Sequence, residues 1–357
     1  MSTQTIAISP GKRLIFWGLL VLFWVALVAG AAAVYQRLRP PAGVALNRAA
    51  WEANYTERHL ALPRPEPREG YWGATLGKRQ KDPYLGWTER ELSRPGLVEV
   101  DSCGMQHAGV SSGPRLRLLI VGASTAFGTY ASTADATYFS ELARTLTRDL
   151  CPVEVTVLSA GGWKSVQEVR ALESRGLDTA PDVVLFLDGL NDLTLGSRAR
   201  DLFGERTATR DGSQWNLWYS AHDYKARVAL YQRNLARARA LLAARGIHAV
   251  YAVQPALFDK RPLSRLERLL DHATLVPHAS KAAVQASYEA MRDVLRTLAQ
   301  DPAADFIDCS YAFDGERATV FTDIAHFADP GHHLLAACLA RELAPILGPR
   351  CPAGASP

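Results

Sequence analysis

The sequence predicts an α/β protein with a doubly wound parallel sheet in three layers (α/β/α), preceded by one N-terminal transmembrane helix. Two observations lead to this prediction. Short apolar runs alternate with helical patterns from Arg115 to Leu347, and an uncharged apolar stretch runs from Leu14 to Tyr35. Apolar strands that alternate with helices are typical of a parallel sheet covered on both faces.

The first element is the apolar stretch from Leu14 to Tyr35. Roughly 20 apolar residues cross a bilayer core as a helix. Lys12 and Arg13 precede the stretch, which favours a cytoplasmic N-terminus over residues 1–13. We therefore expect a signal anchor at 14–35 in a bacterial cytoplasmic membrane, crossed once, with the rest of the chain on the periplasmic or extracellular side. A signal peptide cleaved near residues 31–33 is the alternative.

Residues 36–113 are interpreted as a juxtamembrane linker and extension. The composition is that of a globular protein, with 48% hydrophobic and 21% charged residues among 357. Forty basic residues nearly balance 36 acidic ones, and no block of like charge suggests a nucleic-acid partner. Five cysteines permit disulfides outside the cytoplasm and leave at least one thiol over. The sequence does not indicate the oligomeric state.

The regular pattern occupies residues 114–348, with a C-terminal tail at 349–357. The expected strands are 115–122, 153–162, 181–189, 247–255 and 305–310. The expected helices are 134–150, 166–177, 222–245, 281–299 and one that opens at Asp329, an acidic N-cap candidate followed by Pro330. Two longer connections, 196–220 and 256–280, interrupt this pattern.

Polar or glycine-bearing loops follow these strands. Ser124 follows the first strand, Gly161 the second and Asn191 the third, while Asp323 and His326 precede the last helix. Ligands of open α/β sheets bind beyond the carboxyl ends of the strands. We therefore expect these five residues to lie in one site.

Together the four loops resemble the sequence blocks of the SGNH (GDSL-type) hydrolase family, which contribute Ser, Gly, Asn and His. Ser124 in Gly-x-Ser-x-x-x-Gly matches the first block and Gly161 the second. Asn191 in Gly-x-Asn-Asp matches the third, and Asp323-x-x-His326 the last. The first block reads Gly-Ala-Ser where the family has Gly-Asp-Ser. The resemblance covers about residues 115–347 and implies a flavodoxin-like SGNH hydrolase domain in a membrane-anchored bacterial member.

The chemistry of these residue types agrees with the roles that the resemblance implies. A serine hydroxyl needs an adjacent base, so Ser124 is the expected nucleophile and His326 the expected base. Asp323 would hold the other ring nitrogen and stabilise the imidazolium. The backbone N–H groups of Ser124 and Gly161 and the amide of Asn191 would form the oxyanion hole.

Other sites fit the sequence less well. A dinucleotide loop needs Gly-x-Gly-x-x-Gly after the first strand, which is missing here. His332 and His333 follow His326 closely, so a metal site with Asp323 is conceivable, but the intervening helix start disfavours convergence. No cofactor or metal is implied. Asp192 is interpreted as a brace for the loop of Asn191.

The expected function is that of an extracytoplasmic serine esterase that works through an acyl-enzyme on Ser124. The resemblance implies an ester-bearing substrate, with O-acetyl groups on a glycan as the plausible class. Two alternatives stay open: an O-acetyltransferase acting on a cell-envelope polysaccharide, and a non-catalytic envelope scaffold with the same fold.

Overall fold

The chain divides into two units, Met1–Ala45 and Leu46–Pro357, and each is described by itself. The computed structural model describes residues 10–38, 79–82, 84–96, 98–194, 224–272 and 281–353. Much of the expected linker and the connection 196–220 lie outside the described residues.

The first unit contains one long helix, α1 (Pro10–Leu38). Its large apolar side chains between Ile15 and Val28 are mostly exposed. Over the described residues, no helix has both the length and the hydropathy that a membrane crossing requires. The membrane anchor therefore stays a prediction from the sequence.

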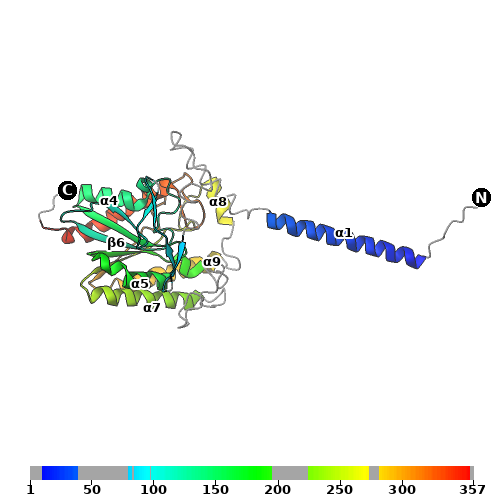
Figure 1. Cartoon of the computed structure of the whole chain (residues 1–357), viewed down its shortest axis with the longest axis horizontal. Coiled ribbons are helices and arrows are strands. Elements are labelled where there is room, and N and C mark those ends of the chain that lie inside the picture. Colours follow the sequence, from blue (N-terminus) through cyan, green and yellow to red (C-terminus); the bar gives the residue numbers. More distant parts are fainter. Residues whose placement is uncertain are drawn as a thin grey trace, which may run out of the picture. The chain divides into compact units, whose positions relative to one another are not determined.

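A six-stranded sheet forms the centre of the second unit (Figure 1). Its strands are β5 (Met105–Gly109), β6 (Leu116–Gly122), β7 (Val153–Ser159), β8 (Val183–Asp188), β9 (His248–Val253) and β10 (Ala304–Ile307). They are arranged in the order β10-β9-β8-β6-β7-β5, and all neighbours are parallel except β5 and β7. The five predicted strands are confirmed, and they have the 2-1-3-4-5 order of a flavodoxin-like sheet.

Helices cover both faces of this sheet, as predicted. They are α4 (Tyr138–Asp149), α5 (Ser165–Ser174), α6 (Leu190–Thr194), α7 (Tyr224–Ala243), α8 (Arg265–His272), α9 (Lys281–Leu298) and α10 (Asp329–Leu347). In Figure 1, α4 lies on one side of β6, and α5 and α7 lie on the other. Leu118 and Ile120 of β6 join the core under α4 and α10, whereas Leu119 and Val121 join the core under α5, α7 and α9. This alternation follows from the two-residue period of a strand.

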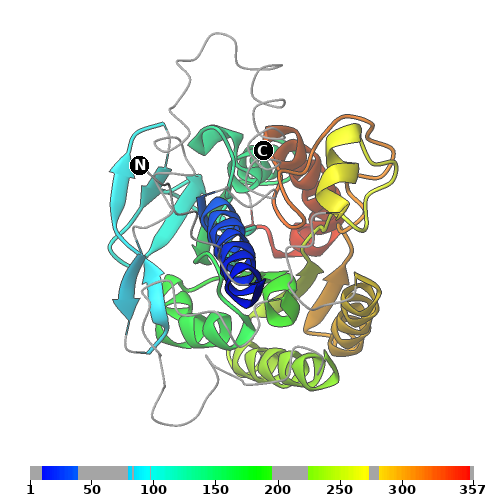
Figure 2. The same ribbon diagram turned by 90° about the vertical axis from the view of Figure 1, so that its right-hand side faces the viewer.

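The extension contributes further strands. They are β1 (Arg79–Asp82), β2 (Gly86–Glu89), β3 (Leu92–Arg94) and β4 (Val98–Val100), which form two antiparallel pairs, β1 with β2 and β3 with β4. β5 forms one edge of the main sheet, and in Figure 2 the cyan strands gather at this edge, away from α9. Residues 105–109 were expected within the extension, yet β5 is an edge strand of the main sheet. Its short sequence, Met-Gln-His-Ala-Gly, lacks the continuous apolar run of the inner strands.

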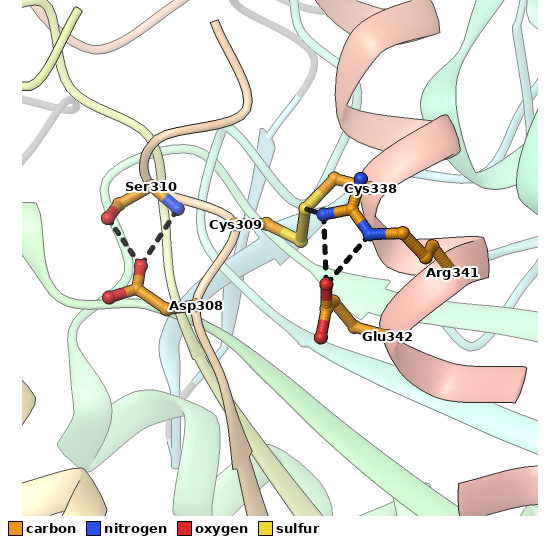
Figure 3. The surroundings of a disulfide bond; sticks show 6 residues. All are labelled: Asp308, Cys309, Ser310, Cys338, Arg341 and Glu342. Carbon is orange, nitrogen blue, oxygen red and sulfur yellow. Dashed lines mark hydrogen bonds and ion pairs between the residues drawn. A yellow bond between two sulfur atoms is a disulfide. The ribbon is translucent and has the colours of Figure 1, made fainter. Parts of the chain in front are cut away.

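The end of the chain is also tied to the fold. Residues 349–357 were expected to be a tail, but Cys351 forms a disulfide with Cys151, just after α4. A second disulfide joins Cys309, after β10, to Cys338 on α10 (Figure 3). Cys103 is an exposed free thiol. The sequence prediction of disulfides with one thiol left over agrees with this arrangement.

Two local predictions need correction. The connection 256–280 contains α8, a short helix that the sequence pattern did not indicate. The N-cap of α10 is Ala328, not Asp329. The carboxylate of Asp329 instead accepts hydrogen bonds from the N–H (2.8 Å) and hydroxyl (2.6 Å) of Ser132, so it links α10 to the segment that follows β6.

Candidate active site

Ser124 lies in the turn directly after β6. This strand lies between β7 and β8, where the order of the strands along the sheet reverses direction. Glycine is required at Gly122, because a Cβ there would lie 2.3 Å from the carbonyl oxygen of Leu187 on β8. A hydrogen bond from the N–H of Phe127 to the carbonyl of Ala123 (2.9 Å) closes the turn. The candidate nucleophile therefore lies at the topological switch point of the sheet, where such folds place their ligands.

Asp323 and His326 share one tight turn before α10. One carboxylate oxygen of Asp323, Oδ1, accepts hydrogen bonds from the N–H groups of Ala325 (2.7 Å) and His326 (2.8 Å). The other, Oδ2, lies 2.7 Å from Nδ1 of His326. The N–H of Thr322 donates to the carbonyl of His326 (2.9 Å) and closes the turn. Backbone and side-chain bonds together fix the orientation of the imidazole.

The same imidazole reaches Ser124. Nε2 of His326 lies 2.7 Å from Oγ of Ser124. An ionised Asp323 can only accept, so Nδ1 carries the ring proton and Nε2 is free to accept the serine hydroxyl proton. The three residues that the sequence predicts as nucleophile, base and acid are therefore joined in one hydrogen-bonded chain.

The charge of Asp323 is stabilised in the fold. Burial by itself raises the pKa of a carboxyl group, but the charge and hydrogen bond of His326 and the two backbone N–H groups outweigh it. The pKa of Asp323 consequently lies below its usual value. An ionised carboxylate next to Nδ1 is the state that favours an imidazolium at His326.

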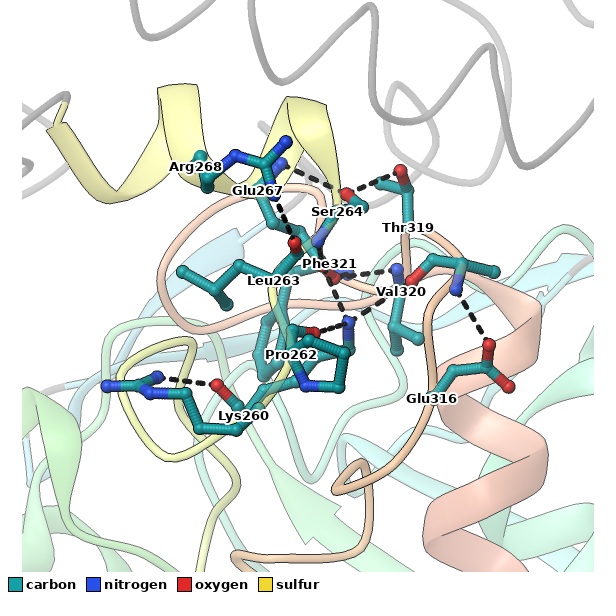
Figure 4. A network of polar contacts seen from close by, with 12 residues as sticks. Lys260, Pro262, Leu263, Ser264, Glu267, Arg268, Glu316, Thr319, Val320 and Phe321 are labelled. Carbon is teal, nitrogen blue, oxygen red and sulfur yellow. Dashed lines mark hydrogen bonds and ion pairs between the residues drawn. The ribbon is translucent and has the colours of Figure 1, made fainter.

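A buried ion pair holds the segment that leads into this turn (Figure 4). Nζ of Lys260 lies 2.7 Å from Oε2 of Glu267, and both side chains are fully buried. Oε1 of Glu267 accepts hydrogen bonds from the N–H groups of Val320 (2.8 Å) and Phe321 (3.1 Å). Glu267 lies on α8, so this unpredicted helix fixes the backbone two residues before Asp323.

Two of the three expected oxyanion donors, Asn191 and Gly161, have other partners in the structure. The side-chain amide of Asn191 donates to the carbonyl of Trp163 (2.9 Å), which leaves its second N–H hydrogen. The N–H of Gly161 donates to Oε1 of Glu89 (3.2 Å), at the end of β2. A backbone amide has one hydrogen, so Gly161 is not free for an oxyanion in this arrangement. The sequence offered no sign of this contact, because Glu89 lies 72 residues before Gly161.

The loop of Gly161 is further fixed by β2. The indole N–H of Trp87 donates to the carbonyl of Gly161 (3.1 Å), and the indole N–H of Trp163 donates to the carbonyl of Trp87 (2.9 Å). Gln167 adds a hydrogen bond from its amide to the carbonyl of Leu85 (3.0 Å). The extension is thus hydrogen-bonded to the loop of Gly161 and to α5 after it.

Acidic groups are buried behind Asn191. Asp192 accepts hydrogen bonds from the N–H (3.0 Å) and hydroxyl (2.6 Å) of Ser165, which agrees with its expected bracing role. Burial, with the charge of Asp188, raises its pKa to about 6. Burial and the adjoining Asp188 raise the pKa of Glu168 well above its usual value, which favours its neutral form. The hydroxyl of Tyr231 donates to Oδ1 of Asp188 (2.7 Å).

The conceivable metal site is not assembled. Nε2 of His332 donates to the carbonyl of Thr129 (3.3 Å), and burial lowers the pKa of His332 to about 4. His333 pairs with Glu141 (2.5 Å). Within the described parts of the chain, no group of three or more His, Cys, Asp or Glu side chains is arranged to hold a metal ion.

A family model matches the part of the chain that contains the candidate site. The family model for the GDSL-like lipase/acylhydrolase family matches residues 120–334, more than half of the chain. A comparison with curated protein sequences found no match.

The chain is similar to several solved structures at low sequence identity. An acetyl xylan esterase, AlAXEase, is 18% identical with a TM-score of 0.41, and the match covers 64% of this chain and 100% of that one. The lipase/acylhydrolase from Enterococcus faecalis is 16% identical with a TM-score of 0.40 over 65% and 96% of the two chains. TesA is 16% identical with a TM-score of 0.43 over 65% and 99%.

The family match includes the turn after β6, the loops of Gly161 and Asn191, and the turn of Asp323 and His326. It excludes the extension, and with it Trp87 and Glu89. On the strength of this match, the chain belongs to the GDSL-like lipase/acylhydrolase family and is an ester hydrolase.

Proposed function

We propose that this protein is a serine esterase that acts outside the cytoplasm, on O-acetyl groups of carbohydrate, through an acyl-enzyme on Ser124. The observation that carries the proposal is the hydrogen-bonded chain from Asp323 through His326 to Ser124, with 2.7 Å at both contacts of the imidazole. The acetylated glycan is the substrate class that the sequence resemblance implies.

The geometry supports a two-step reaction. Nε2 of His326 accepts the hydroxyl proton of Ser124 while Oγ attacks the ester carbonyl carbon. The intermediate then expels the alcohol, which takes that proton from His326, and the acyl group stays on Ser124. In the second step a water molecule gives a proton to His326 as its oxygen attacks the acyl carbon. Ser124 leaves with the proton, and the acid is released.

Turnover of p-nitrophenyl acetate by the purified full-length protein tests the nucleophile. We expect Ser124→Ala to lose at least about 10³-fold in kcat, because the residual rate would come from binding and the oxyanion donors alone. The exposed Ser112→Ala is the matched control and should keep full activity. Equal turnover by wild type and Ser124→Ala would sink the assignment. Preferential acetyl transfer to an added methyl glycoside would assign the transferase alternative.

The location outside the cytoplasm is supported by two disulfides, Cys151–Cys351 and Cys309–Cys338, which persist in oxidising compartments. The uncharged run from Leu14 to Tyr35 supports a membrane anchor at the N-terminus.

The exposed thiol of Cys103 provides the test of location. We expect a membrane-impermeant maleimide to label Cys103 in intact spheroplasts, with the labelled full-length chain in the membrane fraction. Cys103→Ser is the negative control. Labelling only after lysis would place the body in the cytoplasm, and labelled protein in the soluble fraction would indicate a cleaved signal peptide.

A further inference from the structure

The side chain of Glu89, which lies outside the region that the family model matches, accepts a hydrogen bond from the backbone N–H of Gly161 in the candidate site. Oε1 of Glu89 accepts the hydrogen bond of the Gly161 N–H at 3.2 Å, and Glu89 is only 4% exposed. The neighbouring Trp87 is bonded to the same loop in both directions, through Gly161 and Trp163. The contact is therefore built into the packing of β2 and is not the chance position of a surface side chain.

This contact has a chemical consequence for the reaction. The Gly161 N–H has one hydrogen, so a substrate carbonyl oxygen can use it only if Glu89 gives it up. A carboxylate beside the point where an oxyanion forms also opposes the new negative charge. Removal of one oxyanion donor typically costs about 10²–10³ in turnover. With Gly161 in its expected role as an oxyanion donor, a plain ester has one donor fewer in this arrangement.

A substrate can remove this obstacle by offering Glu89 another donor. A buried carboxylate that loses a hydrogen bond is destabilised, so Glu89 releases Gly161 more readily when a replacement donor is bound. A hydroxyl group next to the ester bond is such a donor. An ester whose neighbouring carbons carry only hydrogen has none.

We propose that Glu89 is a specificity-determining residue that favours esters with a hydroxyl group beside the ester bond, as in partly acylated polyhydroxy compounds. The substrate hydroxyl takes the place of the Gly161 N–H at Glu89, and Gly161 then binds the carbonyl oxygen. This inference deepens the proposed function and rests on it.

A pair of substrates that differ in one hydroxyl group tests the proposal. The full-length protein is assayed with trans-2-hydroxycyclohexyl acetate and with cyclohexyl acetate. We expect Glu89→Ala to raise kcat/KM for cyclohexyl acetate about tenfold or more and to lower the preference for the hydroxy ester by a similar factor. Glu89→Gln keeps an acceptor but loses the charge, so its preference should lie between wild type and Glu89→Ala.

Glu91→Gln, an exposed carboxylate two residues further on, is the matched control and should keep the wild-type preference. Unfolding temperatures close to that of wild type establish that the Glu89 variants fold. An unchanged preference in both variants, or an equal fall on both substrates, would overturn the inference.

Labelling of Ser124 by a fluorophosphonate, whose phosphoryl oxygen occupies the oxyanion hole, separates this inference from the proposed function. Faster labelling of Glu89→Ala than of wild type supports the role of Glu89. Equal labelling of both overturns that role and leaves the nucleophile in place. No labelling of Ser124 in any of these proteins overturns the proposed function, and the inference with it.

Discussion

Buried carboxyl groups in two regions of the second unit differ in their preference for charge. In the turn that follows Phe321, three donors hold Asp323, and the pKa of Asp323 is lowered. Next to Asp188, Glu168 and Asp192 are buried, and their pKa values are raised. The first region stabilises an anion, and the second disfavours one.

This difference matches the opposite needs of the catalytic base, His326, and of the group that would stabilise the oxyanion. The base needs a fixed negative charge behind it, so the fold supplies N–H donors to Asp323. The oxyanion gains from positive or neutral surroundings, because an extra anion there opposes the charge that develops in the reaction. The raised pKa of Glu168 fits this requirement, whereas the carboxyl group of Glu89 lies on the N–H of Gly161, which is the contact from which we infer a role in specificity.

The largest expected effect comes from removing the charge of Asp323. In Asp323→Asn the amide oxygen can keep the backbone donors of the turn, but the amide N–H then faces Nδ1 of His326 and selects the wrong tautomer. We expect kcat for p-nitrophenyl acetate to fall about 10³–10⁴-fold with little change in KM. The exposed Asp293→Asn should leave kcat unchanged. A fall of less than tenfold in Asp323→Asn would mean that His326 does not depend on this charge.

A second, smaller effect is expected from the ion pair that fixes the same turn. Lys260→Met leaves Glu267 buried without its cation, and removal of one partner of a buried pair costs about 3–5 kcal/mol of unfolding free energy. Urea unfolding measures this loss. The matched control, Arg115→Met, breaks a partly exposed pair with Glu154 and should cost no more than about 1 kcal/mol. Equal losses of unfolding free energy in the two variants would mean that the buried pair stabilises the fold no more than the partly exposed pair does.

The strands and the site residues that depend on local sequence pattern could be predicted from the sequence. Apolar runs located the five parallel strands, three of which end at glycine. Residues after these strands located Ser124 and Asn191, and the segment before the last helix located Asp323 and His326. The structure brings Ser124, Asp323 and His326 together as expected, because parallel strands present their carboxyl ends at one edge of the sheet.

The remaining part depends on contacts between distant segments. Glu89 lies on a four-residue strand and Glu267 on an eight-residue helix, and nothing in their neighbours marks them as partners of Gly161 or of the backbone at Val320. Asp329 resembled an N-cap by its position before Pro330, but its carboxylate binds Ser132 instead. Long-range partners of a buried carboxylate are chosen by packing, which a single sequence does not display.

The smallest expected effect is the pH dependence of stability that Asp192 contributes. The pKa of Asp192 is about 6 in the fold and about 3.9 in an unfolded chain, so the native state binds more protons between these values. The contribution of Asp192 to the free energy of unfolding should therefore fall by about 2 kcal/mol between pH 4.5 and 7. Asp323, with a lowered pKa, contributes stability that is lost only as pH falls below this range. Urea unfolding at both pH values should show a smaller fall for Asp192→Asn than for wild type, while the exposed Glu99→Gln behaves like wild type. If the free energy of unfolding changes equally in Asp192→Asn and wild type over this range, Asp192 is ionised throughout. The contrast with Asp323 then does not include Asp192.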